Sequence, residues 1–355
     1  MKQLTKINFK VQRIYAGIDV HLRSWSVSIY MDDIALGTKS FPPSAKILGS
    51  YLRKMYPGCE YLSVYEAGYS GYWIHEELEK EGIKNIIVNP ADVPTKDKEK
   101  RKKTDIVDSR KLAKSLRNNE LDGIYIRSKE VQEDRSLVRM RHRMVKKQTS
   151  CKNQIKGMLS FSGIFLSEEK LYSHWSKKYI EWILDQSKGT TGSSLSLRNL
   201  VEELMCLRKI IAQITKQIRA LSNEKRYKEN VRLLRTIPGI SVLTAMVILT
   251  EFGDINTYSS TDKLCSYVGL LPNEHSSGSK ESRSGIIIRG NKFLKKVLVE
   301  SSWVAVRKDP VLLLSFKNYK KRCIPTKAII KISRKLLNRI RYVLISGKEY
   351  KLLTV

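Results

Sequence analysis

The stretch IYAGIDVHLRSWSVSIY, residues 14–30, decides how the first part of the chain folds. Two largely apolar runs, Ile14–Val20 and Trp25–Tyr30, are separated by only four residues. Runs of this length and composition favour strands, and a short link between them favours a hairpin. The stretch therefore predicts two neighbouring antiparallel strands.

A second group of elements extends this predicted sheet. An amphipathic helix is expected near residues 46–55, after a break at two prolines. Tyr61–Tyr65 reads as a strand, Trp73–Glu81 as a helix and Asn85–Asn89 as another strand. A strand–helix–strand unit with short links makes its two strands parallel. A hairpin followed by such a unit is the layout of an RNase H-like mixed sheet, so the chain is expected to begin with an α/β domain.

Four acidic residues fall at matching places in this predicted domain. Asp19 lies in the middle of the first strand, and Glu66 ends the strand before the crossover helix. Asp105 and Asp108 are three apart in a helix predicted over residues 105–116, so they share one face near its positive end. Hard Mg²⁺, or Mn²⁺ in its place, prefers such oxygen ligands and can activate a phosphodiester. The spacing therefore predicts a metal centre made of these four carboxylates.

Two features near these acids have more than one interpretation. An Asp in Gly-Ile-Asp-Val also occurs at the start of actin-like ATPases, but no glycine-rich phosphate loop follows either strand, which disfavours ATP binding. The basic run KDKEKRKK, residues 96–103, is either a solvated loop or a guide for phosphate. Its candidate nucleic-acid ligands are Lys98, Lys100, Arg101, Lys102 and Lys103. His21 is expected to order the turn of the hairpin.

The charge of the chain points independently to nucleic acid. Its 355 residues include 66 Lys plus Arg against 35 Asp plus Glu, a formal net charge of +31, and 41% are hydrophobic. So basic a globular chain attracts polyanions. No apolar run reaches the roughly 18 residues of a membrane span, and no secretion signal is recognisable, so a cytoplasmic bacterial protein without a membrane partner is expected. The five scattered cysteines indicate neither a disulfide framework nor a zinc site.

The middle of the chain reads as two long charged helices, over residues 131–159 and 197–223, with an irregular insertion between them. In the second helix, apolar residues recur at spacings of three and four, which is typical of a coiled-coil seam. They are Leu200, Leu204, Leu207, Ile211, Ile214, Ile218 and Leu221. We therefore expect an antiparallel arm or an oligomerisation stalk. The predicted domains are a catalytic domain at 1–128, a helical coiled-coil arm at 129–230 and a C-terminal domain at 231–355.

The C-terminal part is predicted to be mainly helical, which makes the fold class α/β plus α. Residues 233–245 read as a helix-hairpin-helix-like unit whose backbone amides suit a phosphate. Residues 272–285 read as a polar loop, and the tail from Lys317 as one basic amphipathic helix. The loop contains Ser276-Ser277-Gly278, which is either flexible filler or an exposed serine nucleophile with cations nearby. The expected nucleic-acid ligands here are Lys280, Arg283, Arg289, Lys292, Lys295 and Lys296.

Two blocks of short motifs occur in the order seen in a known family. They are Asp19-Val-His, Tyr65-Glu-Ala-Gly-Tyr-Ser-Gly71, Lys103-Thr-Asp-Ile-Val-Asp108, Ile237-Pro-Gly-Ile, Tyr267-Val-Gly-Leu-Leu-Pro272, Ser277-Gly278 and Arg289-Gly-Asn291. On these motifs the chain resembles the DEDD insertion-sequence transposases, which include the pilin-segment invertase and bridge-RNA-guided recombinases. Two residues depart from the family pattern, Leu22 where members often have Lys and Ser109 where they often have Ala. Neither change removes a carboxylate.

The resemblance implies a RuvC-like domain that carries the four acids and a C-terminal transposase domain with a nucleophilic serine. That serine is Ser277 by position, although Ser276 stands directly before it. The implied reaction cuts and rejoins DNA through a covalent phosphoserine, assisted by Mg²⁺. Target and donor DNA would be chosen by a structured noncoding guide RNA. A homo-dimer or tetramer is implied, in which the two catalytic domains meet across subunits.

Two other classes of function fit the same residues. One is a metal-dependent RuvC-like endonuclease or Holliday-junction resolvase, in which water attacks the phosphate. The other is a nucleic-acid scaffold whose carboxylates are only structural. A DNA end trapped covalently on the protein would separate the serine recombinase from both.

Overall fold

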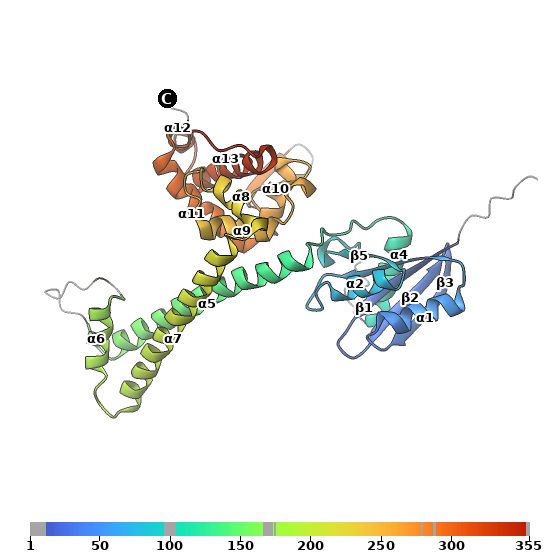
Figure 1. Ribbon diagram of the computed structural model, residues 1–355, viewed down its shortest axis with the longest axis horizontal. Helices are drawn as coiled ribbons and strands as arrows, with labels where there is room; N and C mark the ends of the chain where they lie inside the picture. The colour runs from blue at the N-terminus through green and yellow to red at the C-terminus, as the bar shows by residue number, and fades with distance from the viewer. Residues whose placement is uncertain are drawn as a thin grey trace, which may run out of the picture. The chain divides into compact units, whose positions relative to one another are not determined.

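The chain divides into two compact units, Met1–Ile126 and Arg127–Val355 (Figure 1). The computed structural model describes residues 12–95, 104–165, 173, 175–277, 280–286 and 289–352, and for 273–277 and 280–286 it describes the backbone alone. The basic run at 96–103, with its five candidate ligands, lies outside the described residues.

The first unit is built on a five-stranded mixed sheet. Its strands are β1 (Arg13–Val20), β2 (Trp25–Met31), β3 (Ile34–Phe41), β4 (Glu60–Glu66) and β5 (Lys84–Val88). Its helices are α1 (Ala45–Met55), α2 (Trp73–Lys80), the short 3-10 helix η1 (Pro90–Asp92) and α4 (Asp105–Arg117). The strand order is β3-β2-β1-β4-β5, in which β1, β2 and β3 are antiparallel neighbours and β4 and β5 continue parallel to β1. The predicted hairpin and the parallel strand–helix–strand unit are confirmed.

The sequence pattern does not predict the edge strand β3. Its residues, IALGTKSF, are mostly exposed and mix apolar with small and polar types, so they lack the clear alternation of a strand. Pairing with β2 forms it, from Trp25 opposite Phe41 to Ser28 opposite Thr38, whose hydroxyl oxygens lie 2.7 Å apart.

Helices cover both faces of this sheet. On one face, alternate residues of β1 such as Ile14 and Ile18 form a core with Leu48 of α1 and Ile74 of α2. On the other face, α4 packs through Leu112 against the valines of β4 and β5. The resulting mixed α/β arrangement is consistent with an RNase H-like DEDD domain.

The second unit is mainly helical. Its helices are α5 (Lys129–Phe161), α6 (Lys177–Gln186), α7 (Gly192–Leu221), α8 (Lys225–Leu234), α9 (Val242–Phe252), η2 (Ile255–Thr257), α10 (Thr261–Val268), α11 (Lys292–Lys308), α12 (Pro310–Lys320) and α13 (Pro325–Ser346). A two-stranded hairpin, β6 (Pro272–Ser277) and β7 (Lys280–Ile286), connects α10 to α11. Among the described residues, no helix is both long and apolar enough to cross a membrane.

The two long helices α5 and α7 lie side by side and run in opposite directions (Figure 1). Arg141 of α5 donates a hydrogen bond to the Thr215 hydroxyl of α7, and Cys151 of α5 donates one to the carbonyl of Leu200 of α7. Later residues of α5 therefore contact earlier residues of α7, as in an antiparallel pair. The seam residues of α7 are buried in the hydrophobic core of the second unit or packed against it.

Three details differ from the sequence-based prediction. The insertion read as irregular contains the helix α6, and α7 begins at Gly192, inside the stretch assigned to the insertion. The residues read as a polar loop form the hairpin of β6 and β7. The tail is two helices rather than one, because Pro325 lacks the amide that would continue α12 and instead starts α13.

Candidate metal centre and serine hairpin

Two carboxylates leave the sheet at the same edge. Asp19 is the second-last residue of β1, not a mid-strand residue as predicted, and Glu66 is the last residue of β4. These strands are parallel, and Ile18 lies opposite Tyr65. The next residues of the two strands, Asp19 and Glu66, therefore lie at neighbouring positions. Side chains alternate along a strand. Asp19 therefore lies on the same face as Gly17, which is the face that α4 covers.

The N-terminus of α4 brings the other two carboxylates. The side chain of Thr104 caps this helix by accepting from the amide of Val107, and Asp105 and Asp108 follow in the first turn. The helix lies so close to β1 that a Cβ on Gly17 would be 2.2 Å from the carbonyl of Ser109 and from the amide of Ala113. This contact fixes the height of the helix over the sheet.

Ser109, one of the two departures from the family pattern, takes part in the same contact. Its side chain is buried, and its hydroxyl lies 2.9 Å from that of Ser28 on β2. The hydroxyl also donates to the carbonyl of Ile106 within α4. The Ser109 hydroxyl therefore has hydrogen-bond partners within this tight interface. Serine in place of alanine does not alter the neighbouring Asp108.

The four acids form two neighbouring pairs, each with a basic side chain beside it. The Nε2 atom of His21 lies 3.4 Å from a carboxylate oxygen of Asp19 and 3.4 Å from one of Asp105. The ligand atoms of these three residues all lie within 4.8 Å of one another. In the other pair, the Nζ atom of Lys111 lies 3.8 Å from Glu66 and 3.3 Å from Asp108.

Burial and neighbouring charges both act on the pKa of Asp19 in this centre. Burial raises the pKa of the Asp19 carboxyl above its usual value, and the charges of Asp105 and Asp108 raise it further, while His21 acts in the opposite direction. Bringing a divalent cation to this point would relieve the repulsion. Carboxylates and one imidazole are suitable ligands for such an ion.

His21 and Lys111 are the members of this centre that the sequence analysis missed. His21 was expected only to order the turn, and its amide does bond to the carbonyl of Ser24. Its side chain, however, reaches the acids. A signal was present for both residues: His21 is two positions after Asp19, and Lys111 is one helical turn after Asp108.

Ser277 belongs to the second unit, at the tip of the β6–β7 hairpin. Its backbone lies opposite Lys280, and that of Ser276 lies opposite Glu281. Further along the hairpin, the backbone of Arg283 lies opposite that of Glu274. Gly278 lies outside the described residues. The candidate nucleophile thus occupies the end of a strand pair rather than an irregular loop.

The base of this hairpin is closed by a tight contact between its two ends. The amide of Asn291 donates to the carbonyl of Tyr267, at 2.9 Å. Gly269 and Gly290 both have positive φ, and a Cβ on Gly290 would be 2.7 Å from the Cα of Gly269. Only glycine permits this close approach of the two backbones, so the fold requires glycine at both motif positions.

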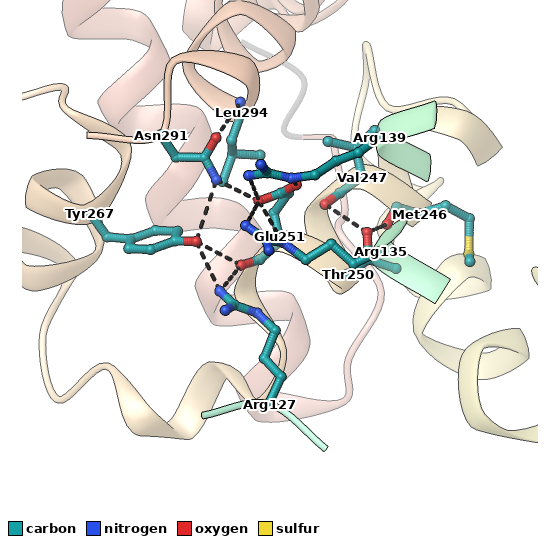
Figure 2. A network of polar contacts seen from close by, with 10 residues as sticks. All are labelled: Arg127, Arg135, Arg139, Met246, Val247, Thr250, Glu251, Tyr267, Asn291 and Leu294. Carbon is teal, nitrogen blue, oxygen red and sulfur yellow. Dashed lines mark hydrogen bonds and ion pairs between the residues drawn. The ribbon is translucent and has the colours of Figure 1, made fainter. Parts of the chain in front are cut away.

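A buried glutamate supports the same base. Figure 2 shows Glu251 of α9, whose side chain is fully buried, held by Arg135 and Arg139 of α5 at 3.0 and 2.6 Å. The side-chain amide of Asn291 donates to the same carboxylate at 2.6 Å, and the Tyr267 hydroxyl donates to the Glu251 carbonyl at 3.0 Å. Burial acts to raise the pKa of Glu251, but these donors and positive charges hold it below the usual value.

The predicted basic ligands that follow the hairpin lie on or just before α11. Arg289, Lys292 and Lys296 are exposed, while Lys295 is half-buried. Burial lowers the pKa of Lys295, and the charge of Lys292 lowers it further. One Lys of the set is partly neutralised, since Lys296 lies 3.7 Å from Glu300.

A cleft of about 630 Å³ lies between α5, α9 and α11. Its wall includes Arg141, Lys296 and Lys308, and His142, whose ring stacks on Phe293 with centroids 4.1 Å apart. The cleft therefore combines cations with an aromatic surface.

Fold and site together define a mixed α/β domain with an acidic DEDD centre, followed by a helical domain. A family model described as a transposase, the DEDD type of IS110, matches residues 16–163, and one described as "Transposase IS116/IS110/IS902 family" matches residues 231–316. The chain belongs to the IS110 family of insertion-sequence transposases.

Curated relatives agree with this assignment. The transposase for insertion sequence element IS1111A of Coxiella burnetii is 26% identical over 64% of this chain and 60% of its own length. A relative from Sinorhizobium fredii is 28% identical over 67% of this chain and 57% of its own length. The transposase for IS1328 of Yersinia enterocolitica is 35% identical over 27% of this chain and 29% of its own. The chain thus spans about three fifths of the length of the first two relatives.

Proposed function

We propose that this protein is the enzyme that cuts and rejoins DNA for an insertion sequence, with a RuvC-like first domain and a serine-bearing second domain. The gathering of four carboxylates at one edge of the sheet carries the proposal, because such a centre serves phosphodiester chemistry. We also retain the division into domains at 1–128, 129–230 and 231–355, with a coiled-coil arm in the middle.

The donor set fits a hard divalent cation. Oxygen atoms of Asp19 and Asp105 lie close enough together to share one ion. Burial is the largest cause of the raised pKa of Asp19, and the charges of Asp105 and Asp108 add to it, so a cation would offset the repulsion among these acids. We take the ion to be Mg²⁺, which Mn²⁺ can replace. When bound, it would supply a Lewis acid that draws charge from a phosphate oxygen. Glu66 and Asp108 are the other two carboxylates of the centre, beside Lys111.

Ser277 is the proposed nucleophile, and Ser276 is the alternative. The serine oxygen forms a bond to phosphorus while the bond from phosphorus to the 3′-oxygen breaks. The hydroxyl proton passes to solvent, and the 3′-oxygen takes one up. A 3′-hydroxyl of another strand later displaces the serine. The number of phosphodiester bonds is conserved, so strand exchange requires no ATP.

Target and donor DNA and a structured noncoding guide RNA are the proposed partners. The net charge of +31 and the exposed Arg289, Lys292 and Lys296 support a large phosphate-binding surface. We assign α8, the turn at Gly239 and α9 to a helix-hairpin-helix-like unit that adds to it. A dimer or tetramer, assembled through the arm, would bring a serine of one subunit to the acidic centre of another.

The decisive experiment traps the serine on DNA. The full chain is incubated with Mg²⁺, its copurified RNA and labelled DNA carrying the ends of the insertion sequence, and then run on a denaturing gel. We expect a protein–DNA adduct that peptide mapping places at Ser277. The Ser277→Ala variant should lose the adduct and recombination while still binding RNA and DNA.

Two results would change the proposal. An adduct at Ser276 keeps the mechanism and moves the nucleophile by one residue. Mg²⁺-dependent nicking without any adduct, unaffected by Ser277→Ala and Ser276→Ala, replaces the serine recombinase with a nuclease that uses water.

A further inference from the structure

The acidic centre contains a built-in cation. Lys111 extends from α4 to a point between Glu66 and Asp108, with its Nζ atom 3.8 and 3.3 Å from their oxygens. Its side chain is only 11% exposed, against 45% for His21 in the other half of the centre. A lysine this well covered stays near its partners, unlike a surface lysine whose ion pairs exchange freely.

The position of this lysine is set by the backbone. Lys111 follows Asp108 by three residues, so both side chains rise from one face of α4. The close packing of α4 on Gly17 prevents the helix from sliding along the sheet. The ammonium group is therefore held where β4 ends, beside Glu66.

The two halves of the centre differ in what they hold. Among the described residues, the basic group between Asp19 and Asp105 is the imidazole of His21. The ligand atoms of these three residues lie within 4.8 Å of one another, a spacing that one ion can bridge. Between Glu66 and Asp108 there is already a positive charge. A divalent ion placed there would have to displace the ammonium or lie directly against it, and like charges at this distance repel.

Centres that use two divalent ions place them about 4 Å apart, one for each oxygen of the displacement. We propose that this centre binds a single divalent ion, between Asp19 and Asp105 with His21 as a further ligand, and that the ammonium of Lys111 takes the place of the second ion. This inference rests on the metal centre proposed above. Lys111 is then a positioning residue, which fixes Glu66 and Asp108 and supplies a permanent positive charge.

The test counts Mn²⁺ ions on the full chain by electron paramagnetic resonance and by titration calorimetry, without any DNA. We expect one bound ion per wild-type chain, with the six-line spectrum of an isolated Mn²⁺. Lys111→Met removes the charge and keeps a long side chain, so this variant should bind a second ion, and coupling between the two ions should broaden the spectrum. Lys111→Arg, which keeps the charge, should bind one.

Lys114 supplies the matched control, because it lies on the same helix but is exposed. Lys114→Met should bind one ion, as the wild type does. If circular dichroism shows that Lys111→Met is poorly folded, a second variant, Glu66→Gln, tests the proposal instead. It keeps Lys111 and removes one carboxylate charge that the proposed ion does not use. That variant should keep its single ion.

The outcomes separate this inference from the function on which it rests. Two ions on the wild type, both lost in Asp19→Asn, overturn the role of Lys111 and leave the metal centre standing. A single ion on a folded Lys111→Met, or loss of the ion in Glu66→Gln, also overturns it. Absence of bound Mn²⁺ from the wild type, or binding that Asp19→Asn does not change, removes the metal centre itself.

Discussion

The acidic centre of the first unit and Glu251 of the second hold carboxylates in opposite electrostatic situations. Asp19 is partly buried beside other acids, and its pKa is raised. Glu251 is fully buried, yet its pKa is lowered because Arg135 and Arg139 bind it and Asn291 donates to it. Burial alone would have raised both. At Glu251 the surrounding positive charge and hydrogen bonds outweigh burial, whereas at Asp19 burial is the largest influence on the pKa and the neighbouring acids add to it.

This difference indicates what each group is for. A carboxylate whose charge is balanced by arginines of the same chain, as in Figure 2, joins elements of the fold and needs nothing from outside. Carboxylates left with an excess of negative charge call for an external cation. The acidic centre combines both situations. Lys111 balances the charge of Glu66 and Asp108, whereas Asp19 and Asp105 are the half at which we propose the external cation binds.

The largest expected effect comes from Asp19→Asn, which removes a charge from the proposed ion site between Asp19 and Asp105. Recombination of a plasmid carrying the insertion-sequence ends should fall by ~10³-fold or more, because a metal ion contributes several kcal/mol to the transition state. The melting temperature should not fall, since one repelling charge is lost. Wild-type recombination by this variant would show that the centre has no metal role.

The opposite behaviour is expected of Glu251→Gln. Leaving two arginines without their buried partner should lower the free energy of unfolding by about 3–5 kcal/mol, measured by urea denaturation. Glu229→Gln is the control, because Glu229 pairs with Arg232 on the exposed surface and its loss should change stability little. Equal effects of the two variants would mean that the Glu251 cluster is no more than another surface ion pair.

Gly17→Ala tests whether packing alone sets the acidic centre. The added methyl would meet backbone atoms of α4 at 2.2 Å, so the helix must move. We expect a loss of about 1–3 kcal/mol in unfolding free energy and weaker Mn²⁺ binding, although no ligand is changed. Gly123→Ala, whose Cβ would make an ordinary 3.4 Å contact with Ile86, serves as the control. Unchanged Mn²⁺ affinity in Gly17→Ala would separate the helix position from the site.

The smallest effect is a dependence on pH. Because the pKa of Glu251 is lowered by folding, its stabilisation is present above the ordinary glutamate value of roughly 4.3 and is lost as the pH falls below it. The slope for one proton is about 1.4 kcal/mol per pH unit. Urea unfolding between pH 7 and pH 3 should show the wild type converging on Glu251→Gln. Parallel curves would mean that Glu251 titrates normally.

Local patterns were sufficient for much of the fold. Apolar runs and short links predicted β1, β2, β4 and β5, and the helical spacing of apolar residues predicted α7, because these segments carry clear patterns of their own. The edge strand β3 and the hairpin of β6 and β7 were missed, since polar and small residues become strands there only by pairing with a neighbour. Pro325 marks in the sequence the point where the basic tail divides into α12 and α13.

For the candidate site, the sequence by itself determined the chemical types and their order: the acids at a strand end and in a first helical turn, and the positive charge of the chain. Only the tertiary structure decided that Lys111 stands between Glu66 and Asp108, and that Arg135 and Arg139 neutralise Glu251 from more than a hundred residues away. The physical reason is that periodicity is a property of one segment, whereas the balance of charge around a carboxylate depends on which segments meet. In the first unit that meeting is set by a glycine, Gly17, against α4.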